Sequence, residues 1–260
     1  GDATSRAVRL AMITMSGEMG YPGVLSAPVW GFEDVSFNGE KLSLPQPFET
    51  YVMENILFKI SFPAEFHAQT AVEAAVKLHK SIKDKIDDIK SIEITTHESA
   101  IRIISKVGEL NNPADRDHCL QYMVAIGLLK GNLVAEDYED DVAKDPRIDT
   151  LREKMVINED KRYSKEYLEA DKRSIANRIQ IHFNDGTSTD EIEVEYPIGH
   201  KRRRAEGITV LEQKFMKNLK TTFDDQKCDE IYKLCADQQK LEETAVTNFQ
   251  KLFALEINSF

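Results

Sequence analysis

The chain lacks the sequence patterns that identify several common classes of protein. No apolar run approaches the ~18 residues that a membrane-spanning helix needs, so we expect no membrane insertion. Neither the GxGxxG pattern nor the GxxxxGK[ST] pattern of nucleotide-binding loops occurs. There is also no internal repeat and no low-complexity tract. The simplest signatures of membrane, nucleotide-binding and repeat proteins are therefore missing.

Cysteine is scarce, and its spacing is wrong for a bound metal. The three cysteines (Cys119, Cys228 and Cys235) form no CxxC pair, and the six histidines are scattered along the chain. An odd number of widely spaced cysteines does not make a disulfide framework, which favours a reducing, intracellular compartment. We accordingly expect neither a metal site nor a cofactor.

Positive charge is in deficit overall. The 260 residues carry a formal charge of −11, which argues against nucleic acid as a partner. With 41% hydrophobic and 30% charged residues, the composition is that of a soluble globular protein with one large or two modest domains. If the ligand is an anion, the positive charge that holds it must be gathered locally.

The beginning of the chain reads as the middle of a larger domain. Its first eighteen residues, GDATSRAVRLAMITMSGE, contain no initiator methionine start and no signal peptide pattern. Apolar residues recur there at helical spacing, which predicts a helix over residues 3–17. The segment 17–32, with four glycines and two prolines, is predicted to be irregular. We therefore interpret the chain as a fragment.

The central part alternates between helix and strand patterns. Apolar spacing predicts a helix over 69–88, and Ile92 and Ile94 alternate with polar neighbours in a predicted strand over 89–97. The clearest pattern is the hairpin 178–196, whose turn Asn184-Asp185-Gly186 supplies a glycine for positive φ. After it, the pattern is helical over 209–255. These features predict an α+β fold, with an antiparallel sheet packed on helices inside a mostly helical body.

Three titratable residues lie close together before the helix at 69–88. They are Lys59, Glu65 and His67, in the stretch FKISFPAEFHAQ. In the functional interpretation, the lysine neutralises a substrate carboxylate, and the histidine beside a glutamate holds or releases a proton. In the other interpretation, they are three solvated side chains at a helix start. The spacing alone leaves both open.

A second candidate cluster follows Pro113, which predicts a helix that ends at Gly131. Helical spacing places His118 and Tyr122 on one face, with Arg116 in the first turn. A tyrosine hydroxyl is a usable acid, and an arginine can clamp a carboxylate with two hydrogen bonds. Alternatively, the helix is half buried and Tyr122 is a core residue.

Two basic segments are further candidates for anion binding. The run GHKRRRAEG (199–207) includes Arg203, and the opening GDATSR includes Arg6. Each precedes or begins a predicted helix, where an anion is favoured. Solvated connectors with ordinary surface charges are the alternative in both cases.

Taken together and in order, the motifs resemble the second half of the MmgE/PrpD family. The matching stretches are GDATSRAVRLA, GEMGYPGVLSAPVWGF, FKISFPAEFHAQTAVEAA, NPADRDHCLQYMVA and YPIGHKRRRAEG. The resemblance implies chains about twice this length, with a large helical domain and an inserted α+β lid. It implies that 1–58 ends the helical domain, that 59–198 is the lid, and that 199–260 returns to the helical domain.

The resemblance also implies an activity and a site. The activity is a hydro-lyase reaction, the dehydration of 2-methylcitrate to 2-methyl-cis-aconitate in propionate catabolism (the methylcitrate cycle), without an iron–sulfur cluster. Lys59 matches a family active-site lysine, and Tyr122 matches a tyrosine that enters the cleft. Glu65 and His67 lie where the family has a catalytic histidine, and which of the two takes its place stays open. The arginine run departs from a G-H-P-x-N-P-like family segment.

These implications define the expected site and its alternatives. We expect Lys59, His67, Glu65 and Tyr122 to act on a small tricarboxylate. The expected substrate-binding residues are Arg116, His118, Arg203 and Arg6. The full-length protein is expected to be a homodimer, in the cytoplasm of a bacterium or the mitochondrial matrix of a eukaryote. The alternatives are a cis-aconitate decarboxylase or another lyase or isomerase of the same family, or a non-catalytic, dimer-forming fragment; the isolated fragment is expected to be inactive.

Overall fold

A computed structural model describes residues 1–44, 47, 56 and 58–255. Its contacts divide the chain into two compact units, Gly1–Tyr51 and Val52–Phe260. The boundaries predicted at 58/59 and 198/199 stay predictions. Within the described residues, none of the helices is both long and apolar enough to cross a membrane.

The first unit contains two helices joined by an irregular segment. Helix α1 spans Asp2–Met15 and helix α2 spans Phe32–Phe37. The helix predicted over 3–17 and the irregular segment after it are both confirmed. Every residue of α1 is exposed within this unit, including the apolar side chains of Val8 and Met12.

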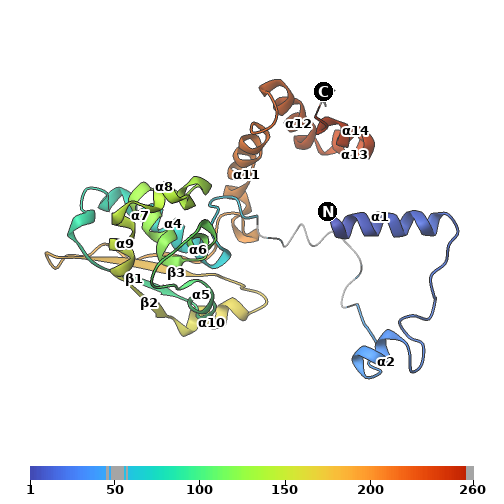
Figure 1. Cartoon of the computed structure of the whole chain (residues 1–260), viewed down its shortest axis with the longest axis horizontal. Coiled ribbons are helices and arrows are strands. Elements are labelled where there is room, and N and C mark those ends of the chain that lie inside the picture. Colours follow the sequence, from blue (N-terminus) through green and yellow to red (C-terminus); the bar gives the residue numbers. More distant parts are fainter. Residues whose placement is uncertain (45–46, 48–55, 57, 256–260) are drawn as a thin grey trace. The chain divides into compact units, whose positions relative to one another are not determined.

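A four-stranded sheet forms the centre of the second unit (Figure 1). Its strands are β1 (Ile89–Thr96), β2 (Met155–Glu159), β3 (Asn177–Phe183) and β4 (Ile192–Val194), in the order β2-β1-β3-β4. Strand β1 pairs antiparallel with β3 and parallel with β2, while β3 and β4 are antiparallel. The α+β class is confirmed, but the sheet is mixed rather than wholly antiparallel, because β2 returns to the edge of the sheet after an intervening run of helices.

The alternation of side chains fixes the register of the two central strands. Buried Ile92 lies opposite Ile181, and buried Ile94 lies opposite Ile179. A slip of one residue would move all four side chains to the other face. The hairpin turn between β3 and β4 has Gly186 at φ +86°, and its N–H donates to the carbonyl of Phe183 at 3.1 Å. The predicted strand and hairpin are confirmed.

Helices α4 (Gln69–Ile82) and α7 (Leu120–Lys130) pack against one another and cover the sheet. Figure 1 shows them on one side of the strands, and α4 also contacts β3 and β4. Helix α7 is buried along almost its whole length and ends at Gly131, with φ +68°. Helix α4 is six residues shorter than predicted, because residues 83–88 form a turn and a 3-10 segment.

The single helix predicted from Pro113 to Gly131 is in fact two. Helix α6 ends at Asp117, and α7 begins at Leu120. The N–H of Cys119 donates to the carbonyl of Arg116 at 3.2 Å, which closes α6 as a tight turn. His118 therefore lies at a break between helices, not on the face that carries Tyr122.

Further helices complete the second unit. They are η1 (Phe66–Ala68), η2 (Ile86–Asp88), α5 (Glu98–Ile104), α6 (Pro113–Asp117), η3 (Ala135–Tyr138), α8 (Asp140–Ala143), α9 (Pro146–Glu153) and α10 (Lys161–Leu168). After β4 come η4 (Lys201–Arg203), α11 (Arg204–Leu219), α12 (Asp225–Ala236), α13 (Gln238–Glu243) and α14 (Val246–Leu252). The last group has a small core of its own around Leu219, Cys228 and Ile231.

Candidate functional site

Glu65 and His67 form a hydrogen-bonded pair at the start of η1. The carboxylate of Glu65 accepts from the backbone N–H of His67 at 2.8 Å, so Glu65 caps this helical turn. The same carboxylate lies 2.9 Å and 3.1 Å from Nδ1 of His67. Both side chains are largely buried, with 14% of Glu65 and 8% of His67 exposed. The structure therefore joins these two predicted residues into one unit.

The environment keeps the Glu65 carboxylate ionised. Burial by itself would raise the pKa of Glu65. The hydrogen bond to His67 and the charge of that ring oppose burial and prevail, so the pKa is lowered from 4.5. Because a carboxylate can only accept, the Nδ1 of His67 must carry the proton that faces Glu65. When the imidazole is neutral, its lone pair is therefore on Nε2.

Tyr167, from α10, reaches the other side of the His67 ring. Its hydroxyl lies 3.3 Å from Nε2 of His67, although the two residues are a hundred positions apart. The Tyr167 ring stacks on His97, with ring centroids 4.7 Å apart and planes 13° from parallel. His97 in turn lies 5.1 Å from the His67 ring, centroid to centroid. Glu65, His67, His97 and Tyr167 therefore form one cluster, which we call the His67 cluster.

His97 is the most deeply buried member of the His67 cluster. It is fully buried at the end of β1, and neither ring nitrogen has a hydrogen-bond partner. Burial, followed by the charge of His67, lowers its pKa from 6.5 to about 4, although Glu65 acts in the opposite direction. The ring is therefore neutral at pH 7. Unpartnered buried nitrogens are costly, and native structures rarely keep them without a function.

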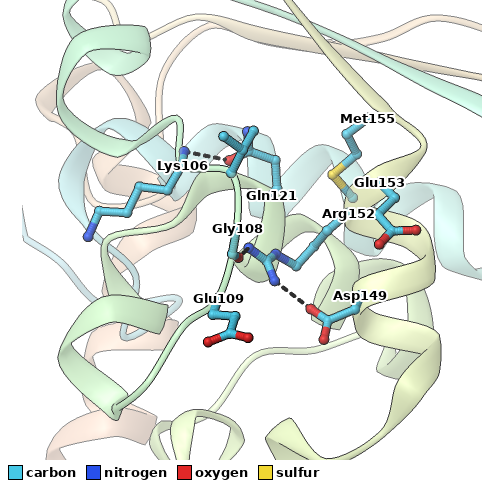
Figure 2. A pocket seen from close by; sticks show the side chains of 9 residues that line it. Lys106, Gly108, Glu109, Gln121, Asp149, Arg152, Glu153 and Met155 are labelled. Atoms are coloured by element: carbon cyan, nitrogen blue, oxygen red, sulfur yellow. Dashed lines mark hydrogen bonds and ion pairs between the residues drawn. The ribbon is translucent and has the colours of Figure 1, made fainter.

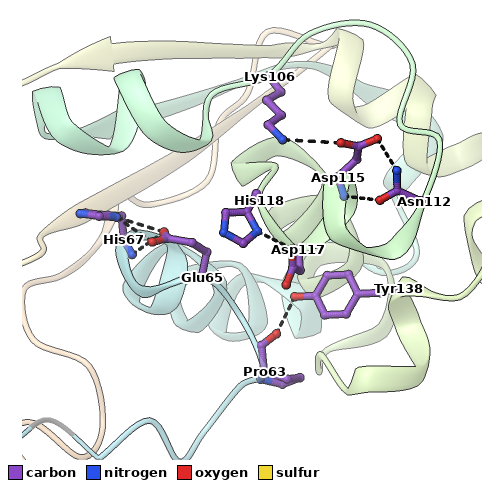
Figure 3. Close-up of polar contacts among 9 residues, drawn as sticks. All are labelled: Pro63, Glu65, His67, Lys106, Asn112, Asp115, Asp117, His118 and Tyr138. Atoms are coloured by element: carbon purple, nitrogen blue, oxygen red, sulfur yellow. Dashed lines mark hydrogen bonds and ion pairs between the residues drawn. The ribbon is translucent and has the colours of Figure 1, made fainter.

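His118 lies on the other side of Glu65. Figure 3 shows the two side chains facing one another, and the charge of His118 acts on the carboxylate of Glu65. Nδ1 of His118 bonds to Asp117 at 2.5 Å, and the imidazole is half exposed. The bend at Pro63, just before Glu65, is held by Tyr138, whose hydroxyl donates to the carbonyl of Pro63 at 2.9 Å. The break between α6 and α7 thus brings an accessible histidine to the Glu65–His67 pair.

Tyr122 and Arg116 are directed into the protein interior instead. The Tyr122 hydroxyl donates to the carbonyl of Asp137 at 2.6 Å, and burial raises its pKa to about 12. Arg116 donates to the carbonyl of Tyr138 at 2.6 Å and pairs with Asp140 at 2.8 Å. Both side chains hold η3 and α8 against the first turns of α6 and α7. Their contacts favour a structural part for both, although their predicted roles stay untested.

Three other predicted residues have contacts with residues outside the His67 cluster. Lys59 is exposed, and its backbone carbonyl accepts from Nζ of Lys214 at 2.6 Å. Arg203 bonds to Glu73 at 2.8 Å and 3.0 Å, and also to Glu206, so its guanidinium joins η4 to α4. Arg6 belongs to the first unit, where it is exposed and pairs with Asp2 at 3.0 Å.

A separate cavity of about 360 Å³ lies beside α9 (Figure 2). Arg152 lies in it, donating to the carbonyl of Gly108 at 2.8 Å and pairing with Asp149. The cavity also presents Lys106 and the carboxylates of Glu109 and Glu153. Three carboxylates against two cations disfavour a ligand with several negative charges. None of the residues that the sequence predicted for the site lines this cavity.

Sequence reasoning missed His97 and Tyr167. Both contact His67 only through tertiary structure, and no local spacing connects them with residue 67. The position of His97 at the end of a predicted strand was the one available signal. In the described part of the chain, no group of three or more His, Cys, Asp or Glu side chains is arranged to hold a metal ion.

Comparison with known proteins places this arrangement in a family. Residues 62–238 match the MmgE/PrpD C-terminal domain. The chain belongs to the MmgE/PrpD family. The match covers Glu65, His67, His97, His118 and Tyr167, whereas Lys59 and Arg6 lie outside it.

Relatives in the MmgE/PrpD family are similar over almost the whole chain. The chain is 54% identical to 2-methylcitrate dehydratase of Escherichia coli K12, over 98% of its own length and 53% of that protein. It is 54% identical to the mitochondrial 2-methylcitrate dehydratase of Yarrowia lipolytica, over 97% of its length and 49% of that protein. A 2-methylcitrate dehydratase-like protein of Aspergillus oryzae, oryR, is 40% identical, over 97% of this chain and 52% of oryR. The chain spans about half the length of the curated relatives it matches.

Proposed function

We propose that this chain is the C-terminal half of a 2-methylcitrate dehydratase. The observation that carries the proposal is the 54% identity to the Escherichia coli enzyme across 98% of this chain. The reaction is the removal of water from 2-methylcitrate to give 2-methyl-cis-aconitate. By its place in the methylcitrate cycle, the enzyme would serve propionate catabolism.

The reaction makes three demands on the protein. A base takes a proton from the carbon next to a carboxylate, an acid protonates the departing hydroxyl, and positive groups hold three carboxylates. The chain has a formal charge of −11, so these positive groups must be local. Lys59, with its exposed side chain, is our candidate for a carboxylate-binding cation.

We assign the two proton transfers to Glu65 and His118. The ionised Glu65 carboxylate, which His67 orients, takes the carbon-bound proton, and the electrons of the broken C–H bond form the new C=C bond. The C–O bond breaks with its electrons, and His118 protonates the leaving hydroxide as water. Because the Asp117 carboxylate only accepts, Nδ1 of His118 keeps its proton, so this step starts from the doubly protonated ring and delivers the proton on Nε2. His118 is the more accessible of the two histidines, as a group that meets substrate should be.

The proposed reaction also bears on the cofactor, on the other half of the protein and on its assembly. Acid–base chemistry with bound cations completes the elimination without a metal or an organic cofactor. The other half of the protein is expected to supply further acid–base residues. The proposed assembly is a homodimer, in a bacterial cytoplasm or a mitochondrial matrix; one similar protein is named as mitochondrial.

The test is an assay of the full-length protein with two substrates. Incubation with 2-methylcitrate should produce the absorbance of a conjugated double bond, with the Escherichia coli enzyme as positive control. Incubation with cis-aconitate, monitored for carbon dioxide, tests the decarboxylase alternative. Release of carbon dioxide without dehydration, or no reaction while the control is active, would contradict the proposal.

The 260-residue chain should be assayed beside the full-length protein. We expect little or no dehydration from it, because the missing half should contribute to the acid–base set. Substantial turnover by the isolated chain would show that the residues described above suffice.

A further inference from the structure

Tyr167 makes a side-chain hydrogen bond to the Glu65–His67 pair from a distant element, helix α10. Its hydroxyl lies 3.3 Å from Nε2 of His67, on the side of the ring opposite Glu65. We propose that Tyr167 is a positioning residue, which fixes the His67 imidazole against Glu65 through this hydrogen bond and is itself held by the ring of His97. The proposal rests on the proposed function, since it assigns Tyr167 to the same reaction.

Hydrogen-bond accounting supports a polar role for Tyr167. Glu65 requires the proton of neutral His67 to be on Nδ1, so Nε2 accepts and the Tyr167 hydroxyl donates. When the imidazole gains a second proton, Nε2–H donates and the same hydroxyl oxygen accepts. Tyr167 can therefore form a hydrogen bond with both the neutral and the doubly protonated ring of His67. At 3.3 Å the bond is long, as acid–base contacts often are without substrate.

The arrangement of elements explains how the Tyr167 ring is held. Helix α5 contacts both η1 and α10, so the start of α5 lies between the His67 turn and the helix that carries Tyr167. His97 is the residue that caps α5, and its ring stacks on Tyr167. The stack orients the phenol without using either nitrogen of His97. Packing of His97 on Tyr167 and of Tyr167 on His67 restricts the orientation of all three rings, as precise placement of an acid–base group requires.

The first experiment compares Tyr167→Phe with a matched control in the full-length protein. Phenylalanine keeps the stack on His97 and removes only the hydroxyl. We expect kcat to fall about tenfold, the scale of one lost hydrogen bond, with KM little changed. Tyr163→Phe removes a hydroxyl from the same helix, where the ring instead packs under Arg162, and should leave kcat unchanged.

The pH profile separates positioning from packing. Loss of the hydroxyl disfavours the doubly protonated imidazole more than the neutral one, because a charged donor makes the stronger hydrogen bond. The acid limb of the kcat profile should therefore move to lower pH in Tyr167→Phe and stay in place in Tyr163→Phe. If Tyr167→Phe has the kcat and the pH profile of the parent, Tyr167 only packs, and the proposal is overturned.

A spectroscopic readout distinguishes failure of this inference from failure of the proposed reaction. In the 260-residue chain labelled with ¹⁵N-histidine, the Nε2 signal of His67 should shift in Tyr167→Phe and not in Tyr163→Phe. An unmoved Nε2 signal refutes the hydrogen bond whatever the enzyme catalyses. If the Nε2 signal shifts but the full-length protein does not dehydrate 2-methylcitrate, the hydrogen bond between Tyr167 and His67 is confirmed. The proposed function is then refuted, and so is the role of Tyr167 in that reaction.

Discussion

The His67 cluster and the polar group around Tyr122 and Arg116 use their hydrogen-bonding groups differently. In the His67 cluster, side chains bond mainly to other side chains, through the carboxylate of Glu65 and the hydroxyl of Tyr167. Around Tyr122 and Arg116, the donors are directed to backbone carbonyls of η3. Both clusters are largely buried and both contain titratable groups. Burial alone therefore does not separate a candidate reaction site from structural polar packing.

The two sets of side chains differ in whether they can exchange a proton while they keep their hydrogen bonds. A donor that satisfies a backbone carbonyl holds the chain in place and has no proton to transfer. A carboxylate–imidazole–hydroxyl series can change its protonation while keeping its hydrogen bonds. Substitutions of Glu65 and Tyr167 should therefore affect activity, and substitutions of Tyr122 and Arg116 should affect stability.

The largest expected effect is that of Glu65→Gln in the full-length protein. Glutamine can still accept from the His67 backbone N–H, but it removes the charge that orients and supports the imidazole. We expect kcat to fall about a thousandfold, within the usual scale for a lost acid–base group. Steady-state kinetics with 2-methylcitrate measure it, and the exposed Glu98→Gln serves as the control. Equal losses in both variants would remove Glu65 from the reaction.

Lys59→Ala should have the next largest effect. If Lys59 neutralises a substrate carboxylate as negative charge develops, its loss should lower turnover at least about a hundredfold. The matched control is Lys80→Ala, which removes an exposed lysine from α4. Near-normal turnover in the Lys59 variant would exclude this residue from the site and restrict it to the surface role that its exposure also allows.

The titration of His97 should have a smaller effect, on the free energy of unfolding and not on the rate of the reaction. Its pKa is about 4 in the folded chain, below its ordinary value of 6.5. Between these two pH values the unfolded chain binds the proton first, so stability falls as the pH is lowered from 6.5 towards 4 and levels off below that. The full loss is on the order of 3 kcal/mol.

Replacing His97 with phenylalanine should remove that loss. The ring keeps its stack on Tyr167, the two unpartnered nitrogens disappear, and the chain should be at least as stable at pH 7. Urea unfolding of both proteins at pH 7 and pH 5 measures the change. His200, whose pKa is also lowered to about 4, remains in both and cancels. An identical pH dependence in the two proteins would show that His97 is not held neutral.

Tyr122→Phe should have the smallest effect. It is also the sharpest test of whether the group around Tyr122 is structural and the His67 cluster is reactive. Loss of its hydroxyl leaves the Asp137 carbonyl without a donor, which should cost about 1 kcal/mol of stability. Turnover should be unchanged. The sequence assigned Tyr122 to proton transfer, and a loss of about a hundredfold in kcat would restore that assignment. Urea unfolding and steady-state kinetics of the same preparation decide between the two.

Local patterns predicted the parts of the fold whose cause is local. Alternation identified β1, and the Asn184-Asp185-Gly186 turn identified the hairpin, because register and positive φ depend on neighbouring residues. Strand β2 was missed, since its parallel pairing with β1 joins segments separated by several helices. The periodicity of the sequence therefore could not predict the order of the strands in the sheet.

The candidate site was only half predictable for the same reason. The short spacing of Glu65 and His67 already suggested a pair, and the structure joins them. Helical spacing could not show that Tyr122 is directed inward, because α7 is buried almost all round and has no distinct polar face. Nor could it anticipate the break at His118 or the approach of Tyr167 to His67. These are tertiary features, and only the folded chain displays them.

The most direct measurement is a structure of the full-length protein with a bound tricarboxylate. We predict that the tricarboxylate lies between the Glu65–His67 pair and His118, with its reacting carbon next to the Glu65 carboxylate. A tricarboxylate bound in the Arg152 cavity, or against Tyr122 with Glu65 and His67 remote from it, would contradict the proposed site.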